Sequence, residues 1–437
     1  MHHLVHGPKA FRTLPSRTGR GEVPRVTNPL MPMRRSLPLL FATFAAACAR
    51  TPVASAPVPA SDDPNLARAH RILAEAPLID GHNDLPWAIR EWKEHPHDVE
   101  RYDLRRTAPG MTDLARLAAG RVGGQFWSVY IPGDTSIARQ GYAKTQLEQI
   151  DIAKRVMAKY PERFEPVTTS AGFREAFARG HIGGALGLEG GHAIENSLGA
   201  LRAFYDMGGR YMTLTHNQTL DWADAAADVA KNGGLTSFGK EVVREMNRLG
   251  MLVDLSHVSP GTMSDALDVS EAPVIFSHSN ARGLADHVRN VPDSILVRLR
   301  QNGGVVMVTF VPGFTSQAII DWNRTPAAQR TGPQPQATLA QVADHIEYIR
   351  RVAGIDHVGL GGDFDGITET VVGLEDVSRY PMLIAELARR GWTDEELAKL
   401  AGGNVLRAFA QAEQVAARLR ATRPPSTATI EALDRRP

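Results

Sequence analysis

Histidine and carboxylate side chains follow several short apolar runs of this sequence, and their types predict a metal site. His82 and Asp84 are two residues apart, so both project to the same face of an extended strand end. Glu189, His257 and His278 each end a further apolar run. Nitrogen and oxygen donors without cysteine are typical of a hydrolytic zinc site, and a catalytic mononuclear zinc keeps about three protein ligands. These residues therefore predict two zinc ions bridged by Glu189.

Further polar residues near the same run ends predict hydrolytic chemistry. Two metal ions about 3.5–4 Å apart can hold a bridging water or hydroxide and polarise a carbonyl group. His216 ends a run but would be a surplus ligand, so we expect it to donate to a developing oxyanion. Asp363 ends the last run and is available as general base or acid. Arg289 suits a substrate carboxylate, and His192, close after Glu189, is a candidate supporting group.

The elements that must position these residues are eight short apolar runs separated by segments of helical periodicity. Strands that alternate with helices form parallel βα units, and eight of them predict a (β/α)8 TIM-type barrel with insertions. In such a barrel the polar residues at the run ends would meet at one mouth. A doubly wound open sheet is the alternative, because one short strand is easily miscounted. The runs are 77–82, 125–130, 184–188, 210–215, 251–256, 273–277, 304–310 and 357–362.

Composition excludes several classes of protein. The 437 residues include 49 Lys+Arg and 48 Asp+Glu, and this balance argues against a general nucleic-acid binder. A single cysteine rules out an internal disulfide and cysteine-rich zinc motifs. With 43% hydrophobic and 22% charged residues, the chain is expected to be globular.

The two ends of the chain do not show the pattern of a folded core. From Met33, a basic pair and an apolar run over 37–47 precede Cys48, which is the layout of an export signal. The small residues before Cys48 resemble a bacterial lipobox, so we expect an exported bacterial protein, periplasmic or anchored by a lipid at Cys48. We assign 1–48 to an N-terminal extension and signal, 49–64 to a Pro/Ala/Ser-rich tether, 65–420 to the barrel and 421–437 to a flexible tail.

Seven stretches of the predicted barrel resemble the renal (membrane) dipeptidase family of binuclear zinc peptidases. They occur in the family's order over about residues 70–410. The stretches are Asp80–Trp87, Glu189–Ile194, Tyr211–His216, Asp254–Ser259, Phe276–Ser279, Arg289–Asp293 and Gly361–Gly366.

The resemblance implies a barrel fold, dipeptide substrates and a role for each matching residue. It makes His82 and Asp84 ligands of one zinc, His257 and His278 ligands of the other, and Glu189 the bridge. His216 and Arg289 match groups that hold the substrate and stabilise its transition state, and Asp363 matches the proton shuttle. Trp87 matches an aromatic residue of the substrate pocket. Phe314 aligns with a pocket tyrosine of the mammalian enzyme, whose phenolic contact this chain lacks. Family members are often dimers, which implies a homodimer.

Two other functions are compatible with parts of the pattern. A different binuclear amidohydrolase, acting on lactams or cyclic amides, would often bridge its metals with a modified lysine, and no run ends in lysine. A catalytically inactive, surface-anchored binding protein would be expected to lack a ligand or Asp363, and all are present. The sequence therefore favours a metallo-dipeptidase of the membrane dipeptidase type.

Overall fold

Eight parallel strands close into a barrel in the computed structural model, which describes residues 62–134 and 138–434. β2 pairs with β1 on one edge and with β4 on the other, and the remaining pairings complete the ring through β5, β6, β7, β8 and β9. The strands of the ring are β1 (Leu78–Asn83), β2 (Val122–Ser128), β4 (Ile182–Glu189), β5 (Gly209–Thr213), β6 (Leu252–Asp254), β7 (Ile275–Phe276), β8 (Val305–Val308) and β9 (Val358–Leu360).

The ring confirms the predicted (β/α)8 architecture, since each of its strands falls within or overlaps one predicted run. A further strand, β3 (Phe164–Pro166), was not predicted. It pairs with Ile182–Gly184 of β4, ahead of the part of β4 that pairs with β5. Three residues give too short a pattern to be recognised against the surrounding loop.

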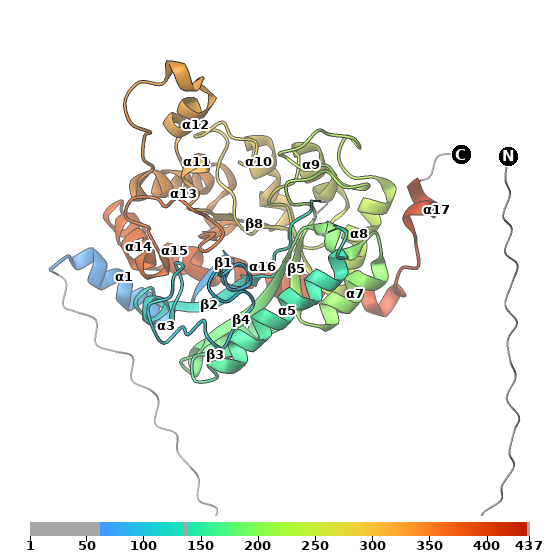
Figure 1. Ribbon diagram of the computed structural model, residues 1–437, viewed down its shortest axis with the longest axis horizontal. Coiled ribbons are helices and arrows are strands. Elements are labelled where there is room, and N and C mark those ends of the chain that lie inside the picture. The colour runs from blue at the N-terminus through green and yellow to red at the C-terminus, as the bar shows by residue number, and fades with distance from the viewer. Residues whose placement is uncertain (1–61, 135–137, 435–437) are drawn as a thin grey trace, which may run out of the picture. The chain divides into compact units, whose positions relative to one another are not determined.

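Helices surround the strands on all sides (Figure 1). Their starts follow local chemistry: Thr236 caps α8 by accepting from Gly239 N, and Gly250, with φ of 85°, ends that helix. The helices are α1 (Pro64–Glu75), α2 (Leu85–Arg90), α3 (Leu114–Ala119), α5 (Tyr142–Lys159), α6 (Ser170–Ala178), α7 (Leu198–Asp206), α8 (Ser237–Leu249), α9 (Pro260–Val269), α10 (Asp293–Asn302), α11 (Pro312–Thr315), α12 (Gln317–Arg324), α13 (Leu339–Ala353), α14 (Tyr380–Arg389), α15 (Asp394–Ala398), α16 (Asn404–Thr422) and α17 (Ile430–Asp434).

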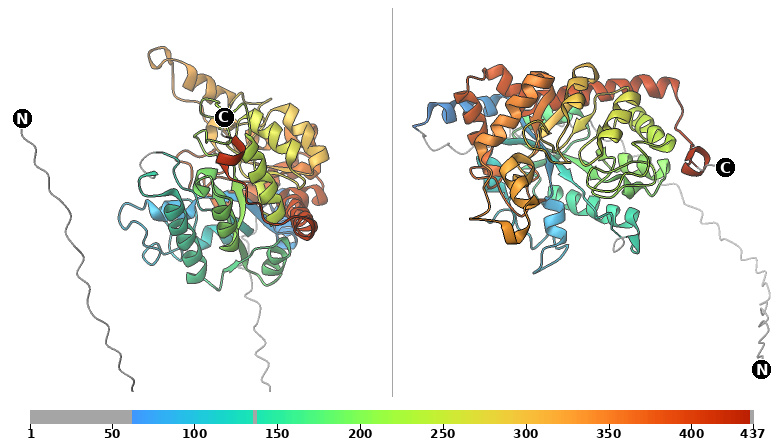
Figure 2. Two further views of the ribbon diagram at one scale, coloured as in Figure 1. Left: turned by 90° about the vertical axis from the view of Figure 1, so that its right-hand side faces the viewer. Right: turned by 90° about the horizontal axis from the view of Figure 1, so that it is seen from above.

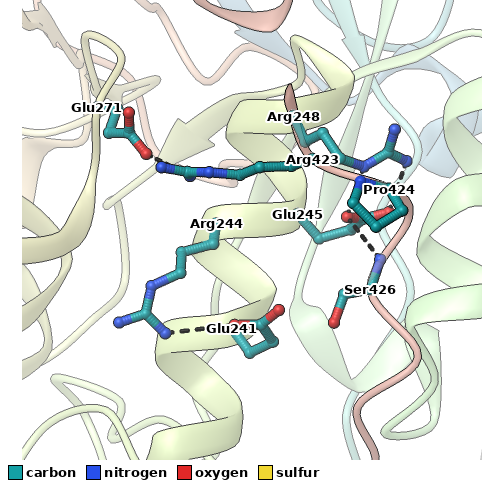
Figure 3. Close-up of a pocket in the computed structure, with 8 residues that line it drawn as sticks. All are labelled: Glu241, Arg244, Glu245, Arg248, Glu271, Arg423, Pro424 and Ser426. Atoms are coloured by element: carbon teal, nitrogen blue, oxygen red, sulfur yellow. Dashed lines mark hydrogen bonds and ion pairs between the residues drawn. The ribbon is translucent and has the colours of Figure 1, made fainter. Parts of the chain in front are cut away.

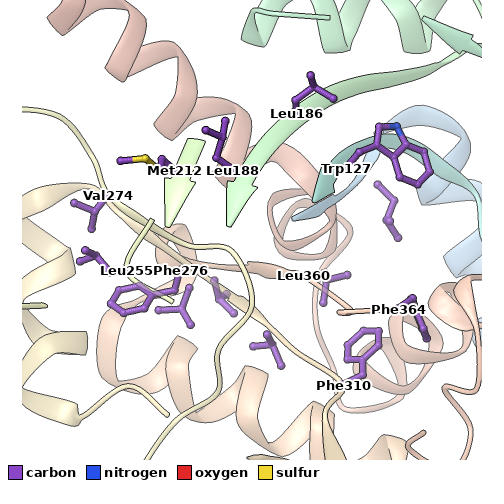
Figure 4. Packing of buried hydrophobic residues seen from close by; sticks show 14 of the residues in the cluster. Trp127, Leu186, Leu188, Met212, Leu255, Val274, Phe276, Phe310, Leu360 and Phe364 are labelled. Carbon is purple, nitrogen blue, oxygen red and sulfur yellow. The ribbon is translucent and has the colours of Figure 1, made fainter. Parts of the chain in front are cut away.

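Successive strand residues enter two different apolar clusters. Trp127, Leu186 and Leu188 belong to the larger cluster, which also includes buried residues of the surrounding helices (Figure 4). Their neighbours Phe126 and Ala185 belong to a second cluster inside the barrel. Because side chains alternate across a strand, each strand is buried on both faces. This explains why the sequence shows nearly continuous apolar runs instead of alternation.

α16 closes the N-terminal end of the barrel. Val405, Leu406 and Phe409 of this helix join the interior cluster, and a Cβ at Gly402 would lie 2.4 Å from the carbonyl oxygen of Pro77, just before β1. The strands therefore leave only their C-terminal end for a site, which is where such barrels carry their chemistry.

Two segments extend the basic barrel. α12 and the residues that follow it project away from the ring, between β8 and α13 (Figures 1 and 2). The C-terminal residues lie against α8, where Asp434 accepts hydrogen bonds from Thr236 Oγ1 at 2.5 Å and from Phe238 N at 3.1 Å. These contacts involve the segment 421–437 that the sequence assigned to a flexible tail.

The predicted export signal, including Cys48, and most of the predicted tether lie outside the described residues. Within residues 62–134 and 138–434, every helix is too short or too polar to cross a membrane.

Candidate metal centre

The candidate ligands gather at the C-terminal ends of the barrel strands. His82 is the second-last residue of β1, and Asp84 is the N-cap residue of α2. Glu189 is the last residue of β4, while His257 and His278 lie just beyond β6 and β7. Ligand atoms of these residues, joined by His216 and Asp363, form three overlapping groups in which the atoms lie within 4.8 Å of one another. The structure therefore brings together all five predicted ligands, whose roles stay predictions.

Glu189 occupies the centre of this cluster and faces His82 on one side and His257 with His278 on the other. Its Oε2 lies 3.4 Å from His82 Nε2, which is itself 3.2 Å from Asp84 Oδ2. Its Oε1 lies 3.1 Å from His257 Nε2 and 3.4 Å from His278 Nε2. A carboxylate with one oxygen on each side has the geometry of a bridge between two metal ions.

Hydrogen bonds at Nδ1 determine which ring nitrogen carries the proton in His257 and His278. His278 Nδ1 lies 2.8 Å from Ser277 Oγ, which donates to Asp254 Oδ2 at 2.6 Å and so must accept from the histidine. His257 Nδ1 lies 3.2 Å from Asn217 Oδ1, an acceptor. With both protons on Nδ1, the two Nε2 lone pairs face each other at 2.9 Å. Two lone pairs at this distance repel unless a cation lies between them.

The cluster also contains buried polar atoms that a metal would satisfy. Among the described residues, His82 Nε2 and Asp84 Oδ1 are buried without a hydrogen-bond partner, and such atoms are costly unless they bind an ion or water. Burial lowers the pKa of His257 and of His278 well below the usual value, which favours the neutral imidazole that metal binding requires. The donor set of imidazoles and carboxylates fits zinc.

Two carboxyl groups beside His82, those of Glu189 and Asp363, have opposite pKa shifts. Burial would raise the pKa of Glu189, but the neighbouring histidines, above all the charge of His82, outweigh it, and the pKa falls well below its usual value. Burial raises the pKa of Asp363 well above its usual value, against the opposing charge of His82, and the charges of Asp84 and Glu189 add to the rise. The two groups thus suit different tasks: a permanent anion and an acid–base group.

Backbone strain accompanies two of the functional side chains. His257 and Asp363 have φ of 68° and 64°, in the left-handed region that non-glycine residues seldom adopt. Each lies just after a strand, where the chain must turn a side chain back over the barrel mouth. Such residues persist where the surrounding structure enforces them, and they are frequent at active sites.

Arg289 is a buried cation with weak contacts. Its side chain belongs to a residue only 3% exposed, and its guanidinium reaches the carbonyl oxygen of His278 and Ser279 Oγ at 3.4 and 3.5 Å. Its Nε has no hydrogen-bond partner among the described residues. Phe314 packs beneath the guanidinium at 5.2 Å. Burial lowers the pKa of Arg289 to about 10, so it remains charged at neutral pH and available to an anion.

An aromatic row leads from the predicted pocket residue Trp87 to the cluster. Trp87 contacts Tyr130 edge-on with ring centroids 4.9 Å apart, and Tyr130 lies 4.7 Å from His216. Tyr130 was not among the predicted site residues. It ends the second apolar run, so selecting polar residues at run ends could have found it. His192 instead hydrogen-bonds the carbonyl oxygen of Ile131 at 3.0 Å, away from the three ligand groups.

A separate surface pocket of about 200 Å³ lies between α8 and the C-terminal segment (Figure 3). Its charges pair with each other: Arg248 with Glu245 at 2.8 Å, and Arg423 with Glu271. Because these charges already pair with each other, the pocket is a weaker candidate for a metal than the cluster around Glu189.

The chain is similar to known proteins in both sequence and fold. A family model described as membrane dipeptidase (Peptidase family M19) matches residues 66–423. The chain is similar to the probable dipeptidase PvdM from Pseudomonas aeruginosa, with 24% identity, a TM-score of 0.70 and coverage of 80% of this chain and 99% of that one. It is similar to dipeptidase AC, a metallopeptidase of family M19, with 26% identity, a TM-score of 0.67 and coverage of 77% and 98%.

A third solved structure is a metallopeptidase from Rhodobacter sphaeroides liganded with a phosphinate mimic of the dipeptide L-Ala-D-Ala. It has 25% identity and a TM-score of 0.66, with coverage of 77% of this chain and 99% of that one. These structures share the fold of this chain along almost their whole length.

Gly366 provides a test of the carboxylate arrangement. A Cβ at this position would lie 2.3 Å from Asp84 Oδ2 and 2.7 Å from Asp363 Oδ1. Because both contacts are ends of side chains, we expect Gly366→Ala to fold but to displace the two carboxylates. Zinc affinity, measured by chelator competition, should fall at least about tenfold. The control Gly199→Ala, whose Cβ would meet only Ser197 Oγ at 3.4 Å, should bind zinc as the parent does. Equal affinity in both variants would contradict the arrangement.

Proposed function

The chain is a metallo-dipeptidase of the membrane dipeptidase family, and we propose that it hydrolyses dipeptides with two zinc ions at the mouth of its barrel. The position of Glu189 carries this proposal. Its two carboxylate oxygens face His82 on one side and His257 with His278 on the other. A single buried carboxylate with a ligand group at each oxygen is the arrangement that a binuclear site needs.

The proposed ligand sets share Glu189. One ion would be held by His82, Asp84 and Glu189, and the other by Glu189, His257 and His278. When bound, two zinc ions supply a Lewis acid for the scissile carbonyl and lower the pKa of the attacking water.

His216 is placed to stabilise the charge that develops on the carbonyl oxygen. Its Nε2 lies 4.0 Å from Glu189 Oε1, and its ring lies 4.3 Å from that of His257. Burial lowers the pKa of His216, so the ring is neutral at pH 7 and can donate one N–H. A donor fixed in advance at a developing oxyanion is among the most effective catalytic devices.

Asp363 is placed to move the proton between the attacking water and the leaving amine. Its Oδ1 lies 3.9 Å from His82 Nε2, beside the proposed ligands. Its raised pKa means that this carboxyl group holds a proton more readily than an ordinary aspartate, which suits a group that takes up and passes on a proton.

Arg289 is placed to bind the C-terminal carboxylate of the substrate. The buried guanidinium has weak partners within the protein, so a substrate carboxylate would supply its missing charge-assisted hydrogen bonds. A carboxylate held at a fixed distance from the metals would select dipeptides over longer chains. Trp87 and Tyr130, whose ring row reaches His216, would then line the substrate pocket.

We also propose that residues 1–48 direct export and that Cys48 carries a lipid. The support is the order of a basic pair, an apolar run and small residues before the cysteine of this sequence.

Metal dependence tests the proposal as a whole. Protein stripped by a chelator should lose hydrolysis of a dipeptide library, and added zinc should restore it with about two ions per chain by elemental analysis. The control is chelator-treated protein given Mg²⁺, which prefers oxygen ligands and should not restore activity. Full turnover by metal-free protein would overturn the proposal.

Asp363→Asn tests the proton transfer. The amide keeps the size of the side chain but cannot accept a proton, so kcat should fall about 10²- to 10⁴-fold, while zinc content stays at the parent level. Asp268→Asn, a change at an exposed carboxylate on α9, is the control and should leave both unchanged. A parental kcat in Asp363→Asn would remove Asp363 from the chemistry.

Arg289→Gln tests recognition of the substrate carboxylate. Loss of charge-assisted hydrogen bonds should lower kcat/KM for a dipeptide about 10- to 100-fold. The same dipeptide with a C-terminal carboxamide serves as the control, because it lacks the charge and should be cleaved equally by both proteins. If the variant lost the same factor on the carboxamide, Arg289 would not be the carboxylate site.

A further inference from the structure

His82 is the most completely enclosed of the proposed ligands, and a phenol lies against its outer ring nitrogen. The residue is 0% exposed. Its Nε2 faces Asp84 and Glu189, and its Nδ1 lies 2.8 Å from the hydroxyl oxygen of Tyr211. We propose that Tyr211 is a positioning residue for the metal centre, whose hydroxyl holds the His82 ring with Nε2 directed at the metal. This inference rests on the proposed function.

The contact between Tyr211 and His82 crosses the interior of the barrel. Tyr211 lies in β5 and His82 in β1, and the ring order places β2 and β4 between these strands. Tyr211 is paired in register with Gly187 of β4. A Cβ on Gly187 would lie 2.0 Å from Tyr211 Cζ, so only glycine leaves room for the phenol ring.

The phenol ring is fixed from its other sides by apolar packing. Tyr211 is 0% exposed, and its ring centroid lies 5.5 Å from that of Phe126 in the interior cluster. A fully buried ring with a defined neighbour cannot swing away from His82 without repacking the barrel interior. The hydroxyl therefore has a fixed place from which to hold the imidazole.

The chemistry of metal-bound histidine requires such a partner. A histidine that binds metal through Nε2 carries its proton on Nδ1 and donates it to a second group, which fixes the ring. Ser277 and Asn217 are in place to do this for His278 and His257. For His82, the hydrogen-bond contact of Nδ1 within the described residues is Tyr211, and a phenol oxygen can accept this bond.

The test compares zinc binding in purified full-length variants. Tyr211→Phe removes one oxygen atom and keeps the ring, so the fold and the packing against Phe126 should remain. We expect affinity for one of the two zinc ions to fall about 10- to 100-fold, with the second ion retained, in competition with a chromogenic chelator.

Tyr160→Phe is the matched control. Tyr160 is also 0% exposed, and its hydroxyl accepts one hydrogen bond from Leu104 N at 2.8 Å, apart from the ligand cluster. This variant should lower the unfolding temperature while leaving zinc affinity unchanged. Gly187→Ala, whose Cβ would press on the Tyr211 ring, should reproduce the loss seen in Tyr211→Phe. Far-UV circular dichroism checks that each variant is folded before its zinc affinity is compared.

The outcomes separate this inference from the function on which it rests. Parental zinc affinity in Tyr211→Phe, with two ions bound by the parent, would overturn the positioning role and leave the proposed function intact. A parent protein that bound no zinc would overturn the proposed function itself. An equal loss of affinity in Tyr160→Phe would assign the effect to general destabilisation and overturn the positioning role.

Discussion

The arrangement of the rest of the site depends on the buried carboxylate of Glu189. The residue is only 4% exposed, and a charge removed from water is costly unless it is paired and hydrogen-bonded. Its partners come from four different strand ends: His82 near the end of β1, His216 after β5, His257 after β6 and His278 after β7. They can surround a single group only because the sheet closes into a ring. An open sheet would leave the first and last of these strands far apart, and the same residues could not meet.

In the closed barrel, the N-terminal end contributes to the stability of the fold, and the C-terminal end carries the candidate site. α16 fills the N-terminal end with Val405, Leu406 and Phe409, and the interior cluster extends from there to Tyr211 beneath the ligands. Two functional residues with left-handed backbone, His257 and Asp363, lie at the other end, where loops can carry strain without loss of core packing. Tyr211 joins the two parts, because its ring belongs to the apolar interior and its hydroxyl reaches His82. The packing of the core would therefore restrain the ring of His82, a proposed ligand.

Supporting contacts explain how the neutral imidazoles of His257 and His278 are oriented to bind a cation. Asp254 accepts from Thr213, Ser277 and two backbone amides, and it thereby directs the Ser277 hydroxyl so that it accepts from His278. This orders the proton on the outer nitrogen and leaves the inner lone pair free. The arrangement puts the Nε2 lone pairs of His257 and His278 2.9 Å apart. The fold can sustain their repulsion because a hydrogen bond at Nδ1 holds each ring in place.

Local patterns in the sequence determined the repeating βα unit and identified the polar residues at the strand ends. Each strand is covered on both faces, so each appears as an apolar run, and the residue that follows it must lie at the barrel mouth. This is why His82, Glu189, His257, His278 and Asp363 could be selected without coordinates. Helix bounds such as the end of α8 at Gly250 followed from the same local rules.

Tertiary structure alone decided which atoms meet. His82 and Tyr211 are 129 residues apart, and a tyrosine inside an apolar strand looks like any other core residue. The direction of each Glu189 oxygen, the packing of Phe314 under Arg289 and the row from Trp87 to His216 depend on side-chain rotamers and on the ring's register. Periodicity along a chain records which face a residue occupies, but contacts across a closed barrel arise only when distant strands are brought together.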